Sequence, residues 1–246
     1  MSFIYSDQAP LFGERDVVGY GCVKVIERNA ANEVIKNNHY SRKFYNASYI
    51  HLGVFSDGEL VGVLQFGYAM NPASQNSICE NTKIDEYLEL NRMWLSDSMP
   101  KNSESRAISH ATKFIRRKYP QIKWIMSFAD ERCGLFGCVY QACNFKYFGE
   151  HTSVFWELDG AVYHNSLMTR NPNLSKSAAH LQKNKDRAVS SNYRQFRYIY
   201  FMKPRFEKLC KLSSFSFPKA TSPADELISN QCEEGATPSG RSNNKG

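Results

Sequence analysis

The segment SFADERCGLFGCVYQACNFKYFG, residues 127–149, decides the fold that we expect for this chain. It continues IKWIMSFAD (122–130), an almost uninterrupted apolar run of the kind found in strands that are buried on both faces. Two carboxylates, Asp130 and Glu131, follow where that strand ends, and a helix at about 134–143 carries Tyr140. A pair of strands over 145–160 comes next. The segment therefore predicts a strand–helix–strand unit with acidic residues at the end of its first strand.

The residues before this segment extend the unit to an α/β fold. Residues 49–70 predict a hairpin, because Ser-Asp-Gly-Glu separates two β-rich runs and glycine accepts a positive φ. The other expected elements are strands over 21–28 and 87–97 and helices over 31–44 and 102–120. The resulting order, β-α-β-β-β-α-β-α-β, indicates a mixed β-sheet flanked by helices.

The composition indicates a folded protein that acts inside a cell. Hydrophobic residues make up 42% and aromatic residues 13% of the chain, which is typical of globular proteins. No apolar run approaches the roughly 20 residues that a membrane span needs, and the first residues lack the order of a secretory signal. The formal net charge of +7 favours an anionic partner such as nucleic acid.

The positive charge is concentrated in residues 161–212, which hold eleven Lys and Arg against two acidic residues. We therefore expect three regions: a catalytic domain at 1–160, a basic, aromatic extension at 161–212 that contacts DNA, and a disordered tail at 213–246. Basic side chains would bind phosphates while interleaved aromatic rings stack on bases. The alternative is a solvated basic strand with its aromatic residues in the core. The candidate DNA-binding residues are Lys183, Lys185, Arg187, Arg194, Arg197, Lys203 and Arg205.

The order of elements resembles the acetyltransferase-like (GNAT) fold. In that family the fourth strand and the following helix hold a cofactor pyrophosphate through a glycine-containing loop. The matching segment here is LNRMWLSDSMPKNSESRAIS (90–109), which has no glycine between Arg92 and Ser109. The resemblance assigns Arg92 and Ser105 to the donor site. The missing glycines leave two donor classes open, acetyl-CoA and an aminoacyl-tRNA that carries a glycyl group.

Three segments are also similar to the Mom proteins of transposable phages: NHYSRKF (38–44), ELNRMWLSD (89–97) and SFADERCGLFGCVYQACNF (127–145). With the basic C-terminal part, this resemblance covers about residues 20–210. It implies a phage enzyme, in the cytoplasm of the bacterial host, that adds an acetamido (carbamoylmethyl) group to N6 of adenine in double-stranded DNA. The modification would protect phage DNA from host restriction. The resemblance also implies an iron requirement.

Two other functions remain open at this point. One is an acetyl-CoA-dependent N-acetyltransferase that acts on a protein or a small amine. The other is a DNA-binding protein without catalysis, built on a degenerate transferase fold. The oligomeric state is open as well, with a homodimer as one arrangement.

Asp130, Tyr140 and Tyr40 are the candidate catalytic residues of the expected modification. The adenine N6 amine must lose a proton, and a carboxylate at the mouth of the site can accept it. Asp130 is placed for this role, or else it caps the following helix, whereas Glu131 is expected to be solvated. Tyr140 falls where GNAT enzymes place a tyrosine that protonates the leaving group, with packing as the alternative. Tyr40 would shape the base or donor site.

His39 is a further catalytic candidate and a candidate iron ligand. It lies where the helix over 31–44 loses its periodicity, and histidine and carboxylate are ligands that non-haem iron prefers. Asp130 would be its carboxylate partner. The alternative for His39 is a contact with the helix dipole at the C-terminal end.

Arg92 alternates with Leu90 and Trp94 along the strand over 87–97, so we expect the three side chains to share one buried face. A buried arginine needs an anion. The anion would be a phosphate or carboxylate of the donor, or one of the nearby carboxylates Glu89 and Asp97.

Overall fold

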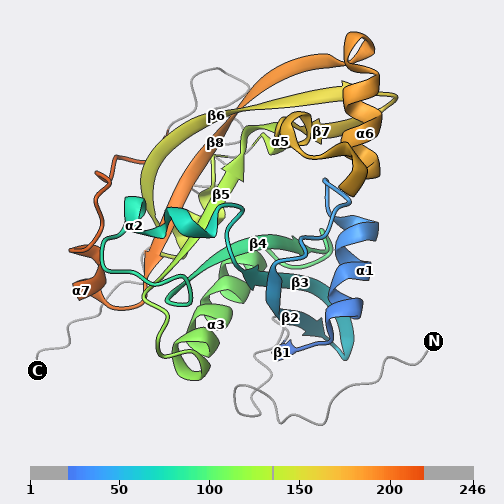
Figure 1. Cartoon of the computed structure of the whole chain (residues 1–246). Coiled ribbons are helices and arrows are strands. Elements are labelled where there is room, and N and C mark those ends of the chain that lie inside the picture. Colours follow the sequence, from blue (N-terminus) through green and yellow to red (C-terminus); the bar gives the residue numbers. More distant parts are fainter. Residues whose placement is uncertain (1–21, 135, 219–246) are drawn as a thin grey trace, which may run out of the picture.

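The computed structural model describes residues 22–134 and 136–218, and its centre is a mixed β-sheet (Figure 1). The sheet has eight strands in the order β1-β2-β3-β4-β5-β8-β6-β7. β4 and β5 are parallel, and all other neighbours are antiparallel. The strands are β1 Cys22–Val25, β2 Ser48–Ser56, β3 Glu59–Gly67, β4 Tyr87–Leu95, β5 Trp124–Asp130, β6 Lys146–Leu158, β7 Ala161–His164 and β8 Val189–Phe201.

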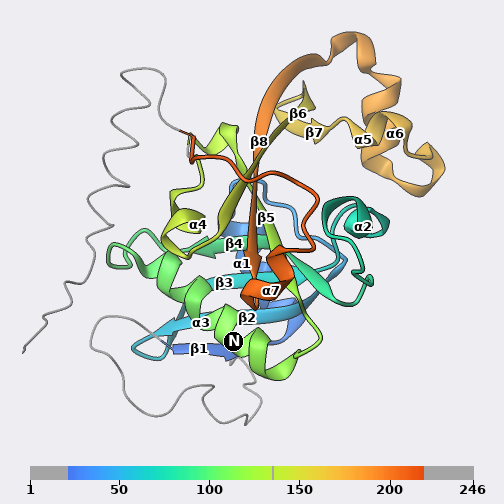
Figure 2. The same ribbon diagram turned by 90° about the vertical axis from the view of Figure 1, so that its left-hand side faces the viewer.

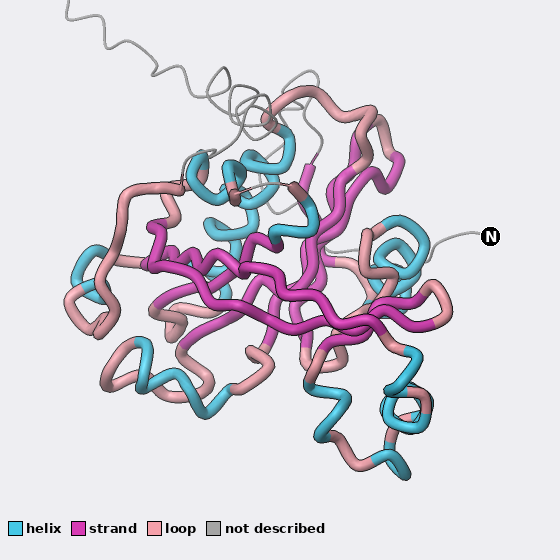
Figure 3. The backbone as a smooth tube through the Cα atoms, turned by 90° about the horizontal axis from the view of Figure 1, so that it is seen from above, coloured by secondary structure: helices cyan, strands magenta, loops and turns pink. Residues whose placement is uncertain are grey.

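Helices cover both faces of this sheet, as the view from above shows (Figure 3). α1 packs Ala31 and Ile35 against Val63 on one face, and α3 packs an apolar stripe against Leu88 and Ile125 on the other. The helices are α1 Arg28–Asn38, α2 Gln75–Ile78, α3 Ser103–Lys118, α4 Cys138–Ala142, α5 Ser166–Thr169, α6 Lys176–Lys183 and α7 Pro204–Glu207. The predicted α/β class, the mixed sheet and the element order as far as β6 are confirmed.

The β2–β3 hairpin has the predicted turn. Asp57 and Gly58 both have positive φ, 50° and 85°. This turn type matches the right-handed twist of the two strands, and glycine accepts such a φ without strain. The hairpin joins β2 to β3, and β3 pairs with β4 on its other side.

Two details of the segment after β5 differ from the prediction. The helix expected at 134–143 is reduced to α4, because Gly134 and Gly137 both adopt left-handed φ and end the regular backbone before Cys138. The expected pair of strands at 145–160 is one strand, β6, because the chain at Gly149 (φ 80°) forms a bulge rather than a turn.

β8 joins the basic segment to the catalytic sheet. It pairs with β5 from Trp124–Phe201 to Asp130–Gln195 and with β6 on its other side. The boundary expected after residue 160 therefore does not separate two structural units, since residues 189–201 lie inside the sheet. β6, β7 and β8 extend beyond the rest of the sheet and carry α5 and α6 at their far end (Figure 2).

β4 and β5 separate soon after they meet. Their register contains three pairs, the last of which is Glu89 with Met126. Ser127 Oγ then donates a hydrogen bond to the Leu90 carbonyl at 3.3 Å, and beyond this point the two strands form no further pairs in the described chain. An opening between β4 and β5 results.

The tail expected at 213–246 lies mostly outside the described residues. Its first residues contact the sheet: the Phe215 N–H donates to the Tyr147 carbonyl at 2.9 Å, and Phe217 stacks on Tyr198. Among the described residues, no helix is long and apolar enough to cross a membrane.

The turn between β5 and α4 gives a test of the packing. We predict that Gly137→Ala destabilises the protein by about 2–4 kcal/mol, because a Cβ there would overlap the Tyr198 ring and the φ of 84° strains any L side chain. Gly58→Ala has a similar positive φ but meets open space, so it should cost only about 1 kcal/mol. Denaturant unfolding measures both. Equal losses would contradict the predicted clash with Tyr198.

Candidate functional site

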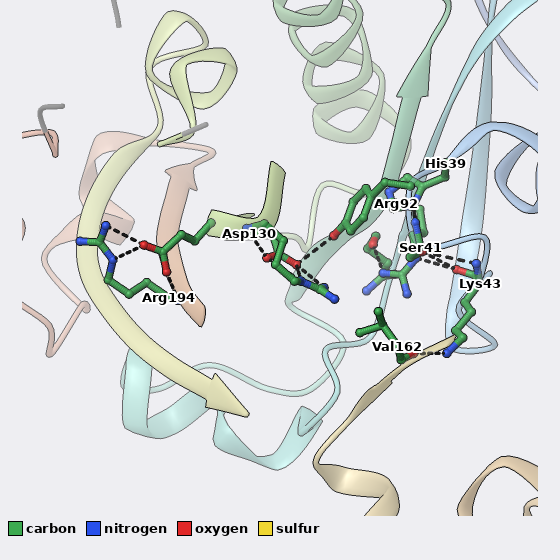
Figure 4. Close-up of polar contacts among 11 residues, drawn as sticks. His39, Ser41, Lys43, Arg92, Asp130, Val162 and Arg194 are labelled. Carbon is green, nitrogen blue, oxygen red and sulfur yellow. Dashed lines mark hydrogen bonds and ion pairs between the residues drawn. The ribbon is translucent and has the colours of Figure 1, made fainter. Parts of the chain in front are cut away.

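Four sequence-predicted residues meet at the opening between β4 and β5. His39 and Tyr40 follow α1, Arg92 lies on β4, and Asp130 ends β5 (Figure 4). The Tyr40 hydroxyl donates to Asp130 Oδ2 at 3.2 Å, and the Arg92 Nε–H donates to the Lys43 carbonyl at 2.8 Å. The loop after α1 thus bridges the two strands where they separate.

Arg92 reaches this opening because of a bulge in β4. Gln65 pairs with Arg92 whereas its neighbour Phe66 pairs with Leu90, so Asn91 is the extra residue. Leu90 therefore faces α3, while Arg92 shares the α1 face with Gln65 and Trp94. The expectation that Leu90, Arg92 and Trp94 share one face is wrong, since a bulge shifts the alternation by one residue.

Asp130 is buried, with 8% of its surface exposed, and Arg132 engages both oxygens of its carboxylate. Oδ1 accepts from the backbone N–H of Arg132 and from its Nε–H, both at 3.0 Å, and Oδ2 accepts from the same guanidinium. Burial by itself would raise the pKa of Asp130, but the hydrogen bonds and charge of Arg132 outweigh it and hold this pKa below its usual range. The carboxylate is ionised, and it is a weak base.

The alternative role expected for Asp130 was to cap the helix that follows it. Asp130 does act as a cap, but of another helix. It precedes a short 3-10 helix, Glu131–Cys133, whose Arg132 N–H it accepts. It does not cap α4, which begins eight residues later at Cys138. The cap and the ion pair both fix the position of Arg132.

Arg132 is a site residue that the sequence did not predict. Its guanidinium lies 3.7 Å from the centre of the Phe155 ring and within 6 Å of the Tyr40 and Tyr193 rings. Stacking on aromatic faces and pairing with a carboxylate are typical uses of arginine. The sequence could have indicated Arg132 only through its position two residues after Asp130. Its aromatic partners Phe155 and Tyr193 come from distant strands, so their contact with Arg132 has no local pattern.

His39 is neutral near pH 7. Its ring is buried, and burial followed by the charge of Arg92 lowers the pKa of His39 to about 4. Nδ1 accepts the Ser41 backbone N–H at 3.1 Å, so the neutral ring carries its proton on Nε2. A neutral ring does not support the alternative of a charged contact with the helix dipole. His39 instead packs against Tyr40, with ring centres 4.3 Å apart.

His39 and Asp130, as placed, do not fit an iron site. Nδ1 of His39 is engaged by Ser41, and both oxygens of Asp130 are engaged by Arg132. Over residues 22–134 and 136–218, no group of three His, Cys, Asp or Glu side chains could hold a metal ion. Arg92 and Arg132 also place positive charge beside both candidates, which opposes binding of a cation.

Tyr140 and Ser105 lie on the other face of the sheet. Tyr140 is buried on α4, and its hydroxyl accepts from Ser127 Oγ at 2.9 Å. Burial raises the pKa of Tyr140 to about 12. Ser105 lies in the first turn of α3, where its hydroxyl donates to the Asn102 carbonyl and its carbonyl accepts from Cys143 Sγ. These two residues could meet the others only through the gap between β4 and β5.

The segment that carries β7 borders the same opening. Lys43 Nζ donates to the Val162 carbonyl at 2.8 Å and lies over the Tyr163 ring (Figure 4). Burial, Arg132 and Arg92 lower the pKa of Lys43. Residues far apart in the sequence therefore bring three basic side chains, Lys43, Arg92 and Arg132, close enough for their charges to interact.

The seven candidate DNA-binding residues do not form one surface. Lys183, Lys185 and Arg187 are exposed near the end of α6, whereas Lys203 and Arg205 are exposed at α7, beyond the other end of β8. The 13 residues of β8 separate these groups by about 40 Å, given the rise per residue of a strand. Arg187 pairs with Asp159 at 2.5 Å.

Arg194 and Arg197 lie on β8 between these two groups. Arg194 pairs with Glu131 at 2.8 Å, so Glu131, which was expected to be solvated, is partly exposed and also has a guanidinium partner on β8. Arg197 is partly buried over the Phe128 ring. Arg194 is therefore paired within the fold, whereas the buried Nε of Arg197 has no hydrogen-bond partner among the described residues.

Comparisons with known proteins gave matches in sequence and in structure. The chain matches the model of the Mom protein family over residues 21–219. It is 49% identical over 213 residues to methylcarbamoylase Mom of Escherichia phage Mu, covering 84% of this chain and 88% of that protein. Among solved structures, a spermidine/spermine N-acetyltransferase from Vibrio cholerae is similar with a TM-score of 0.45, at 11% identity, covering 76% and 95% of the two chains. An N-acetyltransferase from Staphylococcus aureus has a TM-score of 0.43, at 14% identity, covering 74% and 99%.

The Asp130–Arg132 pair gives a stability test. In a double-mutant cycle of Asp130→Asn and Arg132→Met at pH 7, we expect a coupling of about 1–3 kcal/mol, because either single change leaves a partly buried polar group without its partner. The exposed pair Lys146–Glu207 is the control and should couple by less than about 1 kcal/mol. Urea unfolding provides the free energies.

The same pair predicts a pH dependence. Since the folded pKa of Asp130 is lowered, its stabilisation is present above its unfolded pKa and is lost as the pH falls through the folded value. A coupling that is unchanged at pH 2 would contradict this assignment.

Proposed function

Because the chain belongs to the Mom protein family, we propose that it is a methylcarbamoylase that adds a carbamoylmethyl group to N6 of adenine in phage DNA. The modification would protect that DNA from restriction in the cytoplasm of the host. The observation that carries the proposal is the 49% identity to the phage Mu methylcarbamoylase over 88% of that protein. The gathering of His39, Tyr40, Arg92 and Asp130 at one opening supports it.

The chemistry needs a base outside the duplex, an activated donor and a proton acceptor. The N6 lone pair is delocalised into the purine ring, so the amine attacks only when its proton is removed as the new bond forms. Enzymes that react with a base turn it out of the helix, where aromatic side chains stack on it. Tyr40, 57% exposed, Tyr163 and Tyr193 offer aromatic surface beside the opening.

The cations of the opening would hold an anionic group. Arg92, Arg132 and Lys43 influence one another's charge, and burial lowers the pKa of Arg92 and of Lys43. A phosphate or carboxylate placed among them would relieve the repulsion between these cations. Acetyl-CoA and aminoacyl-tRNA both carry phosphates, and both donor classes remain part of the proposal. Ser105, at the first turn of α3, would contact the donor from the far face.

A nucleoside analysis tests the function. Plasmid DNA from bacteria that express the protein is digested and examined by mass spectrometry, and deoxyadenosine that carries a carbamoylmethyl group is the expected product. Asp130→Asn should reduce its amount by about 100-fold, since the charge is lost and an NH2 group replaces one of the two oxygens that accept from Arg132 and Tyr40. Glu59→Gln, in the remote β2–β3 hairpin, is the control. Unmodified deoxyadenosine with the wild-type protein would refute the proposal, and full activity of Asp130→Asn would favour a role for Asp130 in folding alone.

DNA contact is proposed for the α6 end of β8. The hydrogen bond from Lys43 to the Val162 carbonyl connects β7, which lies at this end, to the opening. Lys183 and Lys185 are exposed near the end of α6. The double change Lys183→Ala/Lys185→Ala should reduce the slope of log affinity against log salt by about 2, because each phosphate contact releases about one counterion. The matched change Lys203→Ala/Arg205→Ala, at the other end of β8, should leave the slope nearly unchanged. Binding to a short duplex at several salt concentrations measures both. If only the Lys203→Ala/Arg205→Ala change reduced the slope, the DNA contact would lie at α7 and the proposed contact at α6 would be wrong.

A further inference from the structure

Glu89 occupies the point where β4 and β5 separate. It is the last residue of β4 that pairs with β5, opposite Met126, and it precedes the bulge at Asn91. Alternation along β4 places it on the face of Tyr87, the side of the sheet that Arg92 and Asp130 also occupy. From the sequence, Glu89 was expected only as a counter-ion for Arg92. No ion pair between them is found in the described chain.

A fixed amide holds one oxygen of this carboxylate. Glu89 Oε1 accepts from Asn91 Nδ2 at 3.2 Å. Asn91 is itself held by Ser48, whose hydroxyl donates to Oδ1 at 2.9 Å, and by the Tyr68 carbonyl, which accepts from Nδ2 at 3.1 Å. Among the described residues no donor to Glu89 Oε2 is found, yet this oxygen is not one of the fully buried atoms without a partner, so part of its surface is accessible. This oxygen is therefore the part of Glu89 that the opening can reach.

The surroundings of Glu89 favour its protonated form. Burial, only partly offset by the Asn91 hydrogen bond and by Arg92, raises the pKa of Glu89 to about 7. The titratable and charged groups that interact with it electrostatically are Arg92 and Tyr87 on its own strand, Tyr45 after α1, and Tyr140, which lies on α4 on the other face of the sheet. A carboxylate that titrates near the working pH can both accept and release a proton readily.

Asp130 has the opposite environment, because Arg132 engages both of its oxygens. A carboxylate stabilised in its charged form has little tendency to take up a proton. Its contacts with Arg132 and Tyr40 instead suit a positioning residue.

We propose that Glu89, rather than Asp130, accepts the proton that leaves the adenine N6 amine. This inference rests on the proposed function. In the step, the donor is a carbamoylmethyl group whose methylene carbon bears a leaving group (the carrier), a form that neither acetyl-CoA nor a glycyl ester has as it stands. A bond forms between N6 and that methylene carbon, and the bond from the carbon to the carrier breaks. The electron pair of the broken bond leaves with the carrier, and the N6 proton passes to Glu89 Oε2. Asp130 keeps Arg132 and Tyr40 in place throughout.

The activity test uses purified protein, unmodified plasmid and host-cell extract as the source of donor, at pH values from 5.5 to 8.5. The wild-type initial rate should rise with pH with a midpoint near 7, because only ionised Glu89 accepts a proton. Glu89→Gln keeps the Asn91 contact and should be at least about 100-fold slower, without that midpoint. Glu59→Gln is the matched control and should behave as the wild type does.

The outcomes separate the two proposals. If the wild type modifies no adenine, the proposed function fails. If the wild type is active and Glu89→Gln keeps its rate and pH midpoint, the assignment of Glu89 is overturned while the function stands.

A stability measurement confirms that Glu89→Gln folds and tests the titration without reference to activity. The folded pKa of Glu89 is raised above its unfolded value, so its favourable contribution is present below the unfolded pKa and is lost as the pH rises to about 7. The thermal midpoint of the wild type should therefore fall relative to that of Glu89→Gln between about pH 4.5 and pH 7. A difference between the two proteins that is the same at every pH would count against the proposal.

Discussion

The separation of β4 from β5 is the constraint on which the site depends. Two parallel strands that share three paired positions cannot stay together when one is held elsewhere, and β5 is held by β8 along its whole length. β8 in turn is fixed between β5 and β6, so β5 follows the long β6–β8 pair away from β4. The opening is thus a product of strand pairing, and a single Ser127–Leu90 hydrogen bond closes its inner end.

The same separation gives two carboxylates on one face of the sheet opposite properties. Asp130 ends a strand and meets a guanidinium that its own 3-10 helix presents, so the ionised form is stabilised. Glu89 lies deeper, at the last paired position, where the Asn91 amide donates to it and burial favours the neutral form. Pairs of acidic groups whose environments move their pKa values apart are a common basis for dividing positioning and proton transfer between residues. Arg132 and Arg92 then provide the positive charge that a phosphorylated donor or a DNA backbone would meet.

Part of the site was predictable from single segments. Asp130 at the end of an apolar strand, and His39 and Tyr40 at the end of a helix, are local features, and the resemblance to the Mom proteins assigned all three to one site. The sheet face on which Arg92 lies was not predictable. A bulge at Asn91 shifts the alternation of side chains along β4, and no local pattern in the sequence indicates this bulge. Arg132 was missed for a related reason, since its aromatic partners Phe155 and Tyr193 come from strands that meet only in the sheet.

Local patterns were enough to predict the α/β class, the order of the elements up to β6, the hairpin turn at Asp57 and Gly58, and the family. These depend on periodicity, turn chemistry and motifs, which act over a few residues. Three other features arise only when the chain is folded: the basic segment supplies a central strand, Glu131 binds Arg194, and the pKa of Glu89, not that of Asp130, is raised. The physical reason is that burial and charge depend on neighbours in space, and strand pairing between distant segments selects those neighbours.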